Sequence, residues 1–491
     1  MKVQNLPNLS KAWRLAAIAL IFLPHSYGAH HEISEAGEAL VPLHNPIEQK
    51  IEKGDIMVAV EKRFRLPRLE DMSTGGATTD AHARIQYLNP VGAKSGRMAI
   101  CDLRGALYLA DAEGKAAQLY LNHRDYPISF DNSSMPNETG LAGFAFHPDF
   151  SAKSRPGYGK FYTAFSATSG SGEATYLKDD AGSHESVIVE WTATDPAAIP
   201  FKGTYREVFR IGQFAPNHNI GTLSFNPSAK RRSSDYGNLY FSLGDGGASF
   251  DPKDYGQSLE VPQGAILRIN PLSRSKDRAY GIPNDNPFVS ESNAAPEIWA
   301  YGLRHPQHFS FDKKGRMFIC DIGQKEVEEV NIGAIGGNFG WRIREGTFAT
   351  GFGIEGVEVG PVFELPHDGP ETFIDPVAQY DHEEGRAIGS GFAYEGRKIK
   401  SLKGKFVFAD LVRGRLFYID AGNLEPGIPA EIKELRLMIE GREQDLLDAA
   451  GYPNTYNRGM RADLRLGIDE DKELYLLTKG DGWVRKLVPA E

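Results

Sequence analysis

The stretch GNLYFSLGDGG (237–247) is the part of the sequence that best predicts the fold. It has an aromatic side chain near the start of a short apolar run, and the run leads into a glycine-rich turn. A second apolar run, AILRINP (265–271), follows it. Short apolar runs bounded by Gly, Asn, Asp and Pro are typical of antiparallel strands joined by turns.

Similar strand pairs recur along the chain. The other copies begin with GALYLADAEG (105–114), GKFYTAFSA (159–167), GRMFICDIGQ (315–324), GKFVFADLVRG (404–414) and KELYLLTKGDG (472–482). Repetition of this kind favours a β-propeller, because its blades pack against one another and leave few exposed sheet edges. We therefore expect an all-β, six-bladed β-propeller. A β-sandwich would explain the strands but not their recurrence.

The N-terminus predicts export. Three basic residues precede the apolar run LAAIALIFL (15–23), and the small-residue stretch SYGA (26–29) follows it. This is the pattern of a secretory signal peptide, and the apolar run is shorter than the roughly 20 residues that a membrane anchor needs. We expect cleavage near Gly28 or Ala29, a mature chain without an integral membrane segment, and a periplasmic or secreted protein.

The remaining chain divides into two expected regions. Residues 30–84 are polar and show no sustained periodicity, so we expect an irregular N-terminal arm between the signal peptide of residues 1–29 and a propeller domain of residues 85–491. Only Cys101 and Cys320 are available for a disulfide, which excludes a disulfide scaffold. Because they fall in the first and fourth expected blades, we do not expect them to form a bridge.

The charge balance argues against nucleic acid as a partner. The chain has 55 Lys and Arg against 65 Asp and Glu, a formal net charge of -10 at pH 7. Binding to a phosphate backbone needs a basic stripe, and no such stripe occurs in the sequence.

A histidine and an aspartate form the first candidate site. APNHNIGTLSF (215–225) places His218 just before a predicted strand, and Asp245 follows the next strand. Asp245 could therefore bind one ring nitrogen of His218 and leave the other free as a base. Two simpler interpretations remain: His218 is a hydrogen-bonded core or turn residue, and Asp245 forms an Asx turn in its Gly-Asp-Gly sequence.

Two further stretches suggest ligand binding. In PEIWAYGLRHPQHFSFD (296–312), Arg304, His305, Gln307 and His308 crowd the start of a strand, where their donors suit an anionic or oxygen-rich ligand; a salt-bridged surface loop is the alternative. CDIGQKEVEEVNIGAIGGNFGWRIREG (320–346) combines glycines with acidic side chains. Calcium binds carboxylates and backbone carbonyls, so a calcium site is one interpretation and a solvated acidic strand is the other.

Taken together, these segments resemble the glucose/sorbosone dehydrogenase family, the six-bladed propellers that use pyrroloquinoline quinone (PQQ) and calcium to oxidise sugars. The resemblance covers roughly residues 135–488. Its motifs here are ETGLAGFAFHPDF (138–150), NHNIGTLSF, LYFSLGDGG, GAILRINP (264–271), YGIPNDNPF (280–288), EIWAYGLRHPQ, DIGQKEVEEVN, GGNFGWRIREG and LYLLTKGDGWVRKL.

The resemblance implies oxidation of an aldose or related sugar to its lactone, with electrons passed to an external acceptor. It implies that His218 is the general base and that Asp245 supports it. The implied cofactor-binding residues are Glu138, Arg304, Gln307 and Arg461. The carbonyls of Gly323 and Gln324 would bind the calcium that polarises the quinone, and Glu329 with the Phe339 carbonyl would bind a second, structural calcium.

Three positions depart from the family pattern. His305 replaces the usual asparagine, Val412 aligns with a lysine found in some members, and Asp463 aligns with a second cofactor-facing arginine, with Arg465 close by. PQQ carries three carboxylates, so the loss of two cations would weaken its binding. Two alternatives therefore stay open: a calcium-dependent propeller hydrolase of lactones or esters in which His218 activates water, and a non-catalytic propeller that binds a glycan or a protein.

Overall fold

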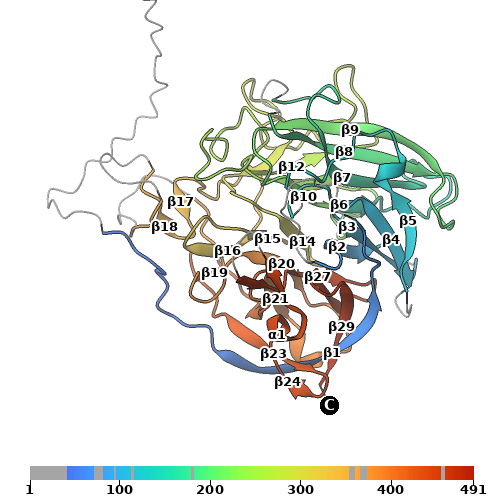
Figure 1. Ribbon diagram of the computed structural model, residues 1–491. Coiled ribbons are helices and arrows are strands. Elements are labelled where there is room, and N and C mark those ends of the chain that lie inside the picture. Colours follow the sequence, from blue (N-terminus) through green and yellow to red (C-terminus); the bar gives the residue numbers. More distant parts are fainter. Residues whose placement is uncertain are drawn as a thin grey trace, which may run out of the picture.

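The computed structural model describes residues 41–70, 81–92, 95–111, 116–135, 137–177, 182–352, 360–364, 373–454 and 459–490. In this part of the chain nearly all regular structure is β-strand, and the sheets are arranged around a common centre (Figure 1). The expected all-β propeller fold is therefore confirmed. The predicted signal peptide of residues 1–29 lies outside the described residues. No helix among the described residues is long and apolar enough to cross a membrane.

Four antiparallel sheets of four strands each follow one another along the chain. The first contains β2 (Ile85–Pro90), β3 (Arg97–Asp102), β4 (Ala106–Asp111) and β5 (Gln118–Asn122). The second contains β6 (Leu141–Phe146), β7 (Lys160–Thr168), β8 (His184–Ala193) and β9 (Gly203–Gln213). The third contains β10 (Ile220–Phe225), β11 (Leu239–Leu243), β12 (Ala265–Ile269) and β13 (Ile298–Tyr301). The fourth contains β14 (His308–Phe311), β15 (Met317–Asp321), β16 (Val327–Ile332) and β19 (Ala378–Asp381).

The last sheet has nine strands and joins both ends of the described chain. One part contains β20 (Ile388–Ala393), β21 (Lys405–Asp410), β22 (Leu416–Asp420) and β23 (Lys433–Ile439), with β24 (Arg442–Glu443) beside β23. The other part contains β27 (Leu464–Ile468), β28 (Leu474–Thr478), β29 (Trp483–Pro489) and β1 (Lys53–Arg65). β1 pairs antiparallel with β29 and parallel with β23. The hydrogen bonding therefore gives four separate sheets and one large sheet, not six separate blades.

Short elements lie in the connections. They are the hairpins β17 (Arg344–Glu345) with β18 (Phe348–Ala349) and β25 (Tyr452–Asn454) with β26 (Gly459–Arg461), the 3-10 helices η1 (His123–Asp125) and η3 (Lys400–Leu402), and the helix α1 (Leu446–Ala450).

The segment before residue 85 is more regular than expected, because residues 53–65 form strand β1. Its buried side chains, Val58 and Phe64, are separated by exposed charged residues, so its apolar pattern is weak in the sequence. The strand is held by pairing with β29, which lies at the other end of the chain. Such a distant partner cannot be recognised from local periodicity.

The first copy of the repeat has a different place in its sheet from the other five. GALYLADAEG contains β4, the third strand of its sheet, whereas the other five copies contain β7, β11, β15, β21 and β28, each next to an inner strand. The matching strand in the first sheet is β3, which reads RMAICD (97–102). Both β3 and β4 are short apolar runs, so only the hydrogen-bonding order distinguishes them.

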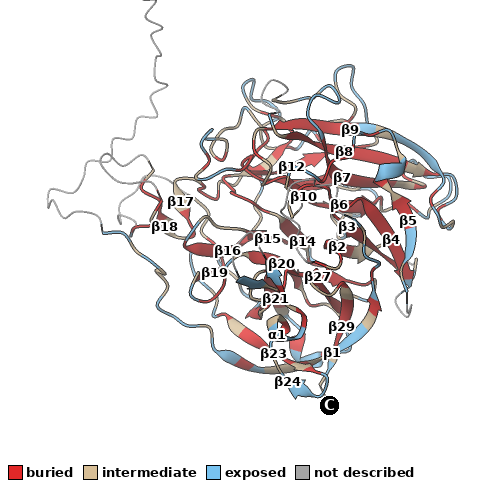
Figure 2. Cartoon of the chain, viewed as in Figure 1, coloured by how far each residue is buried: buried red, intermediate tan, exposed pale blue. Residues whose placement is uncertain are grey.

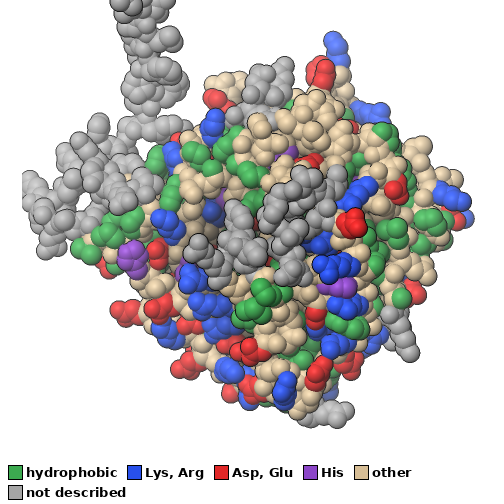
Figure 3. All heavy atoms as spheres, viewed as in Figure 1, with side chains coloured by type: hydrophobic (Ala, Val, Ile, Leu, Met, Phe, Trp, Pro, Cys, Tyr) green, Lys and Arg blue, Asp and Glu red, His purple; other side chains and the backbone are tan. Residues whose placement is uncertain are grey.

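Six strands form a closed ring at the centre of the molecule. β2, β6, β10, β14, β20 and β27 pack against one another in that order, and β27 packs against β2 (Figure 1). Figure 2 shows that strands near the centre are mostly buried, whereas β1, β5 and β9 carry exposed segments at the outside. On the face in Figure 3, acidic and basic side chains are interspersed. The loops at either end of the ring bring together residues that are distant in sequence.

Candidate functional site

His218 and Asp245 are in contact at one end of this ring. His218 lies two residues before β10 and Asp245 two residues after β11, and these strands pair with each other. Nδ1 of His218 is 2.6 Å from a carboxylate oxygen of Asp245, and both side chains are buried. The same oxygen accepts the Gly247 N–H at 2.9 Å. The predicted contact is therefore present, and the Asx-type turn exists beside it.

The pair is held in place from several sides. The other oxygen of Asp245 accepts the Trp341 indole N–H at 2.8 Å. His218 itself has a φ of 58°, in the left-handed region where a residue other than glycine costs roughly 1–2 kcal/mol. A Cβ at Gly244 would lie 2.6 Å from the His218 Cβ, so only glycine fits there. Backbone strain of this kind is typical of functional sites.

His305 stacks on His218. The ring centroids are 4.5 Å apart and the ring planes are inclined by 14°. Nε2 of His305 lies 3.6 Å from the Glu138 carboxylate and 3.3 Å from the Gln307 side-chain amide. The histidine that departs from the family pattern therefore contacts the candidate base directly.

Burial, more than the charges around this pair, keeps His218 neutral at pH 7. Burial, together with the charges of Arg304 and His305, lowers the pKa of His218 to about 4, although Asp245 opposes this. Burial would raise the pKa of Asp245, but His218, Arg304 and the Gly247 N–H together lower it. At pH 7 Asp245 is thus ionised and can only accept, so Nδ1 of His218 carries the proton and Nε2 has a free lone pair.

A group of cations lies next to the two histidines. Gln307 accepts a hydrogen bond from the Arg465 guanidinium at 2.7 Å while its amide nitrogen contacts His305. Arg461 is close by, but it pairs with Asp463 at 2.7 Å, and Asp463 also accepts from the Tyr452 hydroxyl. Asp463 therefore does more than replace a cation, because it also neutralises part of the charge of Arg461.

Lys479 is the residue that sequence reasoning missed in this group. It is 2% exposed, and its ammonium has no hydrogen bond or ion pair within the described residues. Burial lowers its pKa to about 7, and the nearby Arg465 contributes while Asp463 opposes. Burial also lowers the pKa of Arg465 to about 10, and its Nε has no partner among the described residues. A signal was available, since a lysine directly follows the apolar strand LYLLT.

Arg304 and Glu138 both lie beside the histidines. The Arg304 guanidinium donates to the Gln324 side chain at 3.0 and 3.1 Å and to the Ile322 carbonyl at 2.9 Å, and it lies 5.5 Å from the Trp341 ring centroid. The Glu138 side chain is 26% exposed. Burial would raise its pKa, but His305, His218 and Lys479 lower it to about 2. The structure thus brings His218, Asp245, Glu138, Arg304 and Gln307 together.

The side chains around the predicted calcium ligands do not form a metal-binding group within the described residues. Among the described residues, no three His, Cys, Asp or Glu side chains are placed to hold a metal ion. The N–H groups of Gly323 and Gln324 donate to Glu328 at 3.2 Å and Glu345 at 2.9 Å. Glu329 is buried on β16, and burial with the charges of Asp321 and Glu345 raises its pKa well above the ordinary value. Phe339 belongs to an apolar cluster that includes Tyr240 and Phe309.

The other positions noted in the sequence have contacts of their own. The Val412 carbonyl accepts the Ala462 N–H at 3.0 Å. Arg413 donates to the His382 carbonyl at 3.1 Å and to the Glu383 carbonyl, so it does not take the place of the missing lysine. Cys101 on β3 and Cys320 on β15 are both buried and free, as expected.

The chain is similar to several known proteins. Its residues 91–438 match the family described as glucose/sorbosone dehydrogenase. The HIPL1 protein of Arabidopsis thaliana is 28% identical over 396 residues, which cover 71% of this chain and 53% of that protein. The aldose sugar dehydrogenase YliI of Escherichia coli is 29% identical over 142 residues, or 29% of this chain and 33% of that protein. The chain therefore spans about half, or less, of the curated relatives it matches.

A solved structure shows the same fold. The PQQ-bound form of aldose sugar dehydrogenase from Streptomyces coelicolor superposes with a TM-score of 0.53, at 20% identity, over 88% of this chain and 98% of that one. The family match covers more than half of the sequence. The chain therefore belongs to the glucose/sorbosone dehydrogenase family.

Proposed function

We propose that this protein oxidises an aldose or a related sugar to its lactone, with PQQ as its cofactor and an external electron acceptor. One observation carries the proposal: a buried, neutral His218, oriented by Asp245 at 2.6 Å, lies beside cations that have unused donors. A base next to an anion-binding group suits removal of a proton from a substrate bound against an anionic cofactor. The family membership supports the same reaction class.

His218 would act through Nε2. In the proposed reaction Nε2 takes the proton of the anomeric hydroxyl, and Asp245 stabilises the imidazolium that forms. Trp341 keeps the Asp245 carboxylate in position through its indole N–H at 2.8 Å. Bound PQQ would supply a quinone that accepts two electrons from the sugar.

The cations of the site fit a tricarboxylate. Arg461, Arg465 and Lys479 would hold the carboxylates of PQQ, and this makes up for the cations absent at Val412 and Asp463. The Lys479 ammonium and the Arg465 Nε have no protein partner within the described residues, so both can bind an anion without losing an existing contact. Glu138, Arg304 and Gln307, which contact the same group of side chains, would line the sugar and quinone.

Calcium has weaker support. The described side chains do not form a metal-binding group, so a calcium at the carbonyls of Gly323 and Gln324, or at Glu329 and Phe339, remains a prediction from the family resemblance. No step proposed for His218 depends on it.

We also propose that the propeller has six blades. The large sheet would divide into two blades at the parallel pairing of β1 with β23, and the closed ring of inner strands supports this division. The propeller would then begin at β1, and the pairing of β1 with β29 would close it. The sequence pattern of residues 1–29 supports export of the mature protein to the periplasm or the medium.

Calorimetry and a dye-reduction assay would test the function. PQQ would be titrated into the purified protein with and without calcium, and dye reduction would be followed over a panel of aldoses. We expect one-to-one binding, weakened in Lys479→Met, and sugar-dependent dye reduction that disappears in His218→Ala although PQQ still binds. No binding at about 50 µM PQQ would contradict the proposal.

The same preparation distinguishes the two rival functions. Hydrolysis of lactones or esters without PQQ, lost in His218→Ala, would indicate a hydrolase. Binding of a glycan or protein that His218→Ala leaves unchanged, without turnover, would indicate a propeller that has no catalytic role.

A further inference from the structure

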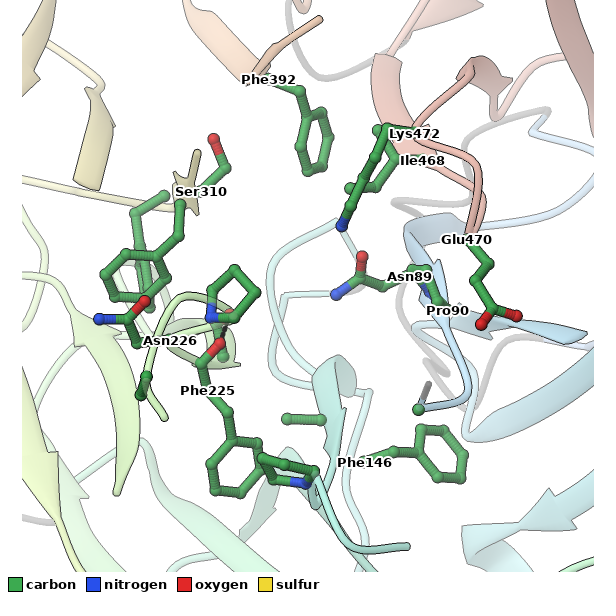
Figure 4. Close-up of a pocket in the computed structure, with 18 of the residues that line it drawn as sticks. Asn89, Pro90, Phe146, Phe225, Asn226, Ser310, Phe392, Ile468, Glu470 and Lys472 are labelled. Carbon is green, nitrogen blue, oxygen red and sulfur yellow. Dashed lines mark hydrogen bonds between the residues drawn. The ribbon is translucent and has the colours of Figure 1, made fainter. Parts of the chain in front are cut away.

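The ring of inner strands has a second opening, at the end opposite to His218. His218 precedes β10, whereas Phe225 is the last residue of β10 and lines this opening. Residues at or near the last positions of β2, β6, β14, β20 and β27 line it as well (Figure 4). The cavity has a volume of about 420 Å³, within the range typical of small-molecule sites. None of the residues placed around His218 belongs to its lining.

Most of the wall is aromatic or aliphatic. The aromatic residues are Tyr87, Phe146, Phe225, Tyr236, Phe309, Phe311 and Phe392. In Figure 4, Phe146, Phe225 and Phe392 stand around the opening on different strands. Such walls favour a ligand with an apolar, preferably aromatic, body.

Lys472 and Glu470 are the charged residues that line the cavity. Lys472 is the one cation among the described residues that line the cavity, and its ammonium has no hydrogen bond or ion pair within the described chain. The Asn89 side-chain amide likewise has no hydrogen bond among these residues, and Figure 4 shows the ends of both side chains directed into the opening. Burial lowers the pKa of Lys472.

The nearby carboxylates are committed to other groups. Asp469 pairs with Lys486 at 2.8 Å, Glu470 accepts the Gly96 N–H at 2.8 Å, and Glu395 accepts the Lys313 N–H at 2.9 Å. All three raise the pKa of Lys472 through their charge, but none is an ion-pair partner of it. An anion in the cavity would therefore meet an ammonium without a competing contact.

The backbone at Lys472 is strained. Its φ is 63°, in the turn between β27 and β28, where glycine would cost less than any side chain with a Cβ. The turn geometry therefore does not call for a lysine, and the side chain has no hydrogen-bond or ion-pair partner among the described residues to account for it. A ligand for the ammonium would account for both observations.

We propose that this second opening binds a small organic carboxylate, with its carboxylate on Lys472 and Asn89 and its aromatic body against Phe146, Phe225 and Phe392. A charge-assisted hydrogen bond in apolar surroundings gives the carboxylate its advantage over a neutral analogue. The site is independent of the function proposed for His218, since the two share no residues.

Cinnamate and cinnamyl alcohol form a matched pair of probes, because they differ mainly in the carboxylate. We expect calorimetry on the full chain to show one-to-one binding of cinnamate and weaker binding of the alcohol. Lys472→Met should weaken cinnamate binding about tenfold or more without affecting the alcohol, and Lys472→Arg should retain the preference for cinnamate. Lys403→Met, at an exposed lysine, should change neither.

Three outcomes would overturn the proposal. They are no cinnamate binding at about 5 mM, equal binding by Lys472→Met and the parent, and binding that is lost in Lys479→Met instead, which would place cinnamate at the His218 end. If Lys472→Met folds poorly, Lys472→Gly removes the charge and relieves the strained φ. The affinity for cinnamate should then fall while circular dichroism and thermal unfolding stay close to the parent.

Discussion

Asp245 and Asp410 occupy similar hairpins and are both buried, but their carboxylates bind different groups. Asp410 accepts three backbone N–H groups, from Arg386 at 2.6 Å, Ala387 at 3.1 Å and Arg413 at 2.5 Å. Asp245 accepts two ring N–H groups, from His218 and Trp341, and one backbone N–H. Burial raises the pKa of Asp410, whereas the neighbouring positive charges lower that of Asp245.

The difference follows from a shift of two residues. Asp410 ends β21 directly opposite the first residue of β20, so it reaches the backbone of the preceding loop. In the other hairpin Leu243 takes that place, and Asp245 lies two residues further, in the turn. There the carboxylate meets side chains instead of the loop backbone.

Two other hairpins show which arrangement is usual. Asp102 accepts the Arg84 N–H at 2.9 Å, and Asp321 accepts the Arg304 and His305 N–H groups at 2.9 and 2.7 Å. An aspartate that binds the preceding loop is thus the repeated structural device, and Asp245 is the exception. An exception to a repeat is where we expect function. Asp321 holds the loop that carries His305, so it also positions a residue of the candidate site.

The largest expected effect is on turnover in Asp245→Asn. The amide would not keep the proton of His218 on Nδ1, so we expect turnover of the PQQ-loaded protein to fall about 1,000-fold. Steady-state dye reduction would measure it, with the urea midpoint as the control for folding. A fall of less than threefold would mean that Asp245 is a structural aspartate like Asp410.

Asp410→Asn should show the opposite pattern. The amide accepts fewer and weaker hydrogen bonds, so buried N–H groups lose their partners and the free energy of unfolding should fall by about 2–3 kcal/mol. Urea denaturation would measure the loss, and turnover per folded molecule should stay within twofold of the parent. Asp420→Asn, at a largely exposed aspartate, is the matched control and should change stability by less than about 0.5 kcal/mol. If Asp410→Asn reduced turnover and left stability unchanged, the two aspartates would not differ in role.

A measurement of the His218 pKa would sharpen the contrast between Asp245 and Asp410. NMR titration of its ring should give a pKa of about 4, and a lower value in Asp245→Asn, where the charge that favours the imidazolium is gone. The ordinary pKa of histidine is 6.5, and that of His218 in the folded protein is about 4. Between these two pH values the unfolded chain binds a proton at His218 that the folded protein does not bind. Stability should therefore fall as the pH is lowered through this window, by up to about 1.4 kcal/mol per unit for this histidine. A pKa near 6.5 in the folded protein would contradict this description of the site.

The smallest effect is expected for Trp341→Phe. The phenyl ring leaves one Asp245 oxygen without its donor, so turnover should fall about five- to tenfold, equivalent to roughly 1–1.5 kcal/mol. The matched change Trp483→Phe, at the first residue of β29 where it pairs with Arg65 of β1, should leave turnover unchanged. Equal effects of the two substitutions would show that the indole N–H of Trp341 has no special role.

Much of the candidate site was predictable because its signals are local. His218 and Asp245 each lie within two residues of a strand whose apolar pattern is clear. The calcium ligands stay a prediction from the family resemblance, since three of the four are backbone carbonyls, which any residue can supply. Trp341 gave no usable signal, because its role depends on a contact with a distant segment, whereas Lys479 gave only a weak one, a lysine directly after the apolar strand LYLLT.

The sequence by itself determined the all-β class, the repeated strand pairs and the likeness to glucose/sorbosone dehydrogenases, because period-two apolar runs and turn residues act over a few positions. Only the tertiary structure decided that β1 pairs with β29, that His305 stacks on His218, and that Lys472 and Lys479 lie at opposite ends of one ring. Those arrangements depend on how the sheets close around a centre. Residues hundreds of positions apart meet there, and no local sequence pattern predicts such contacts.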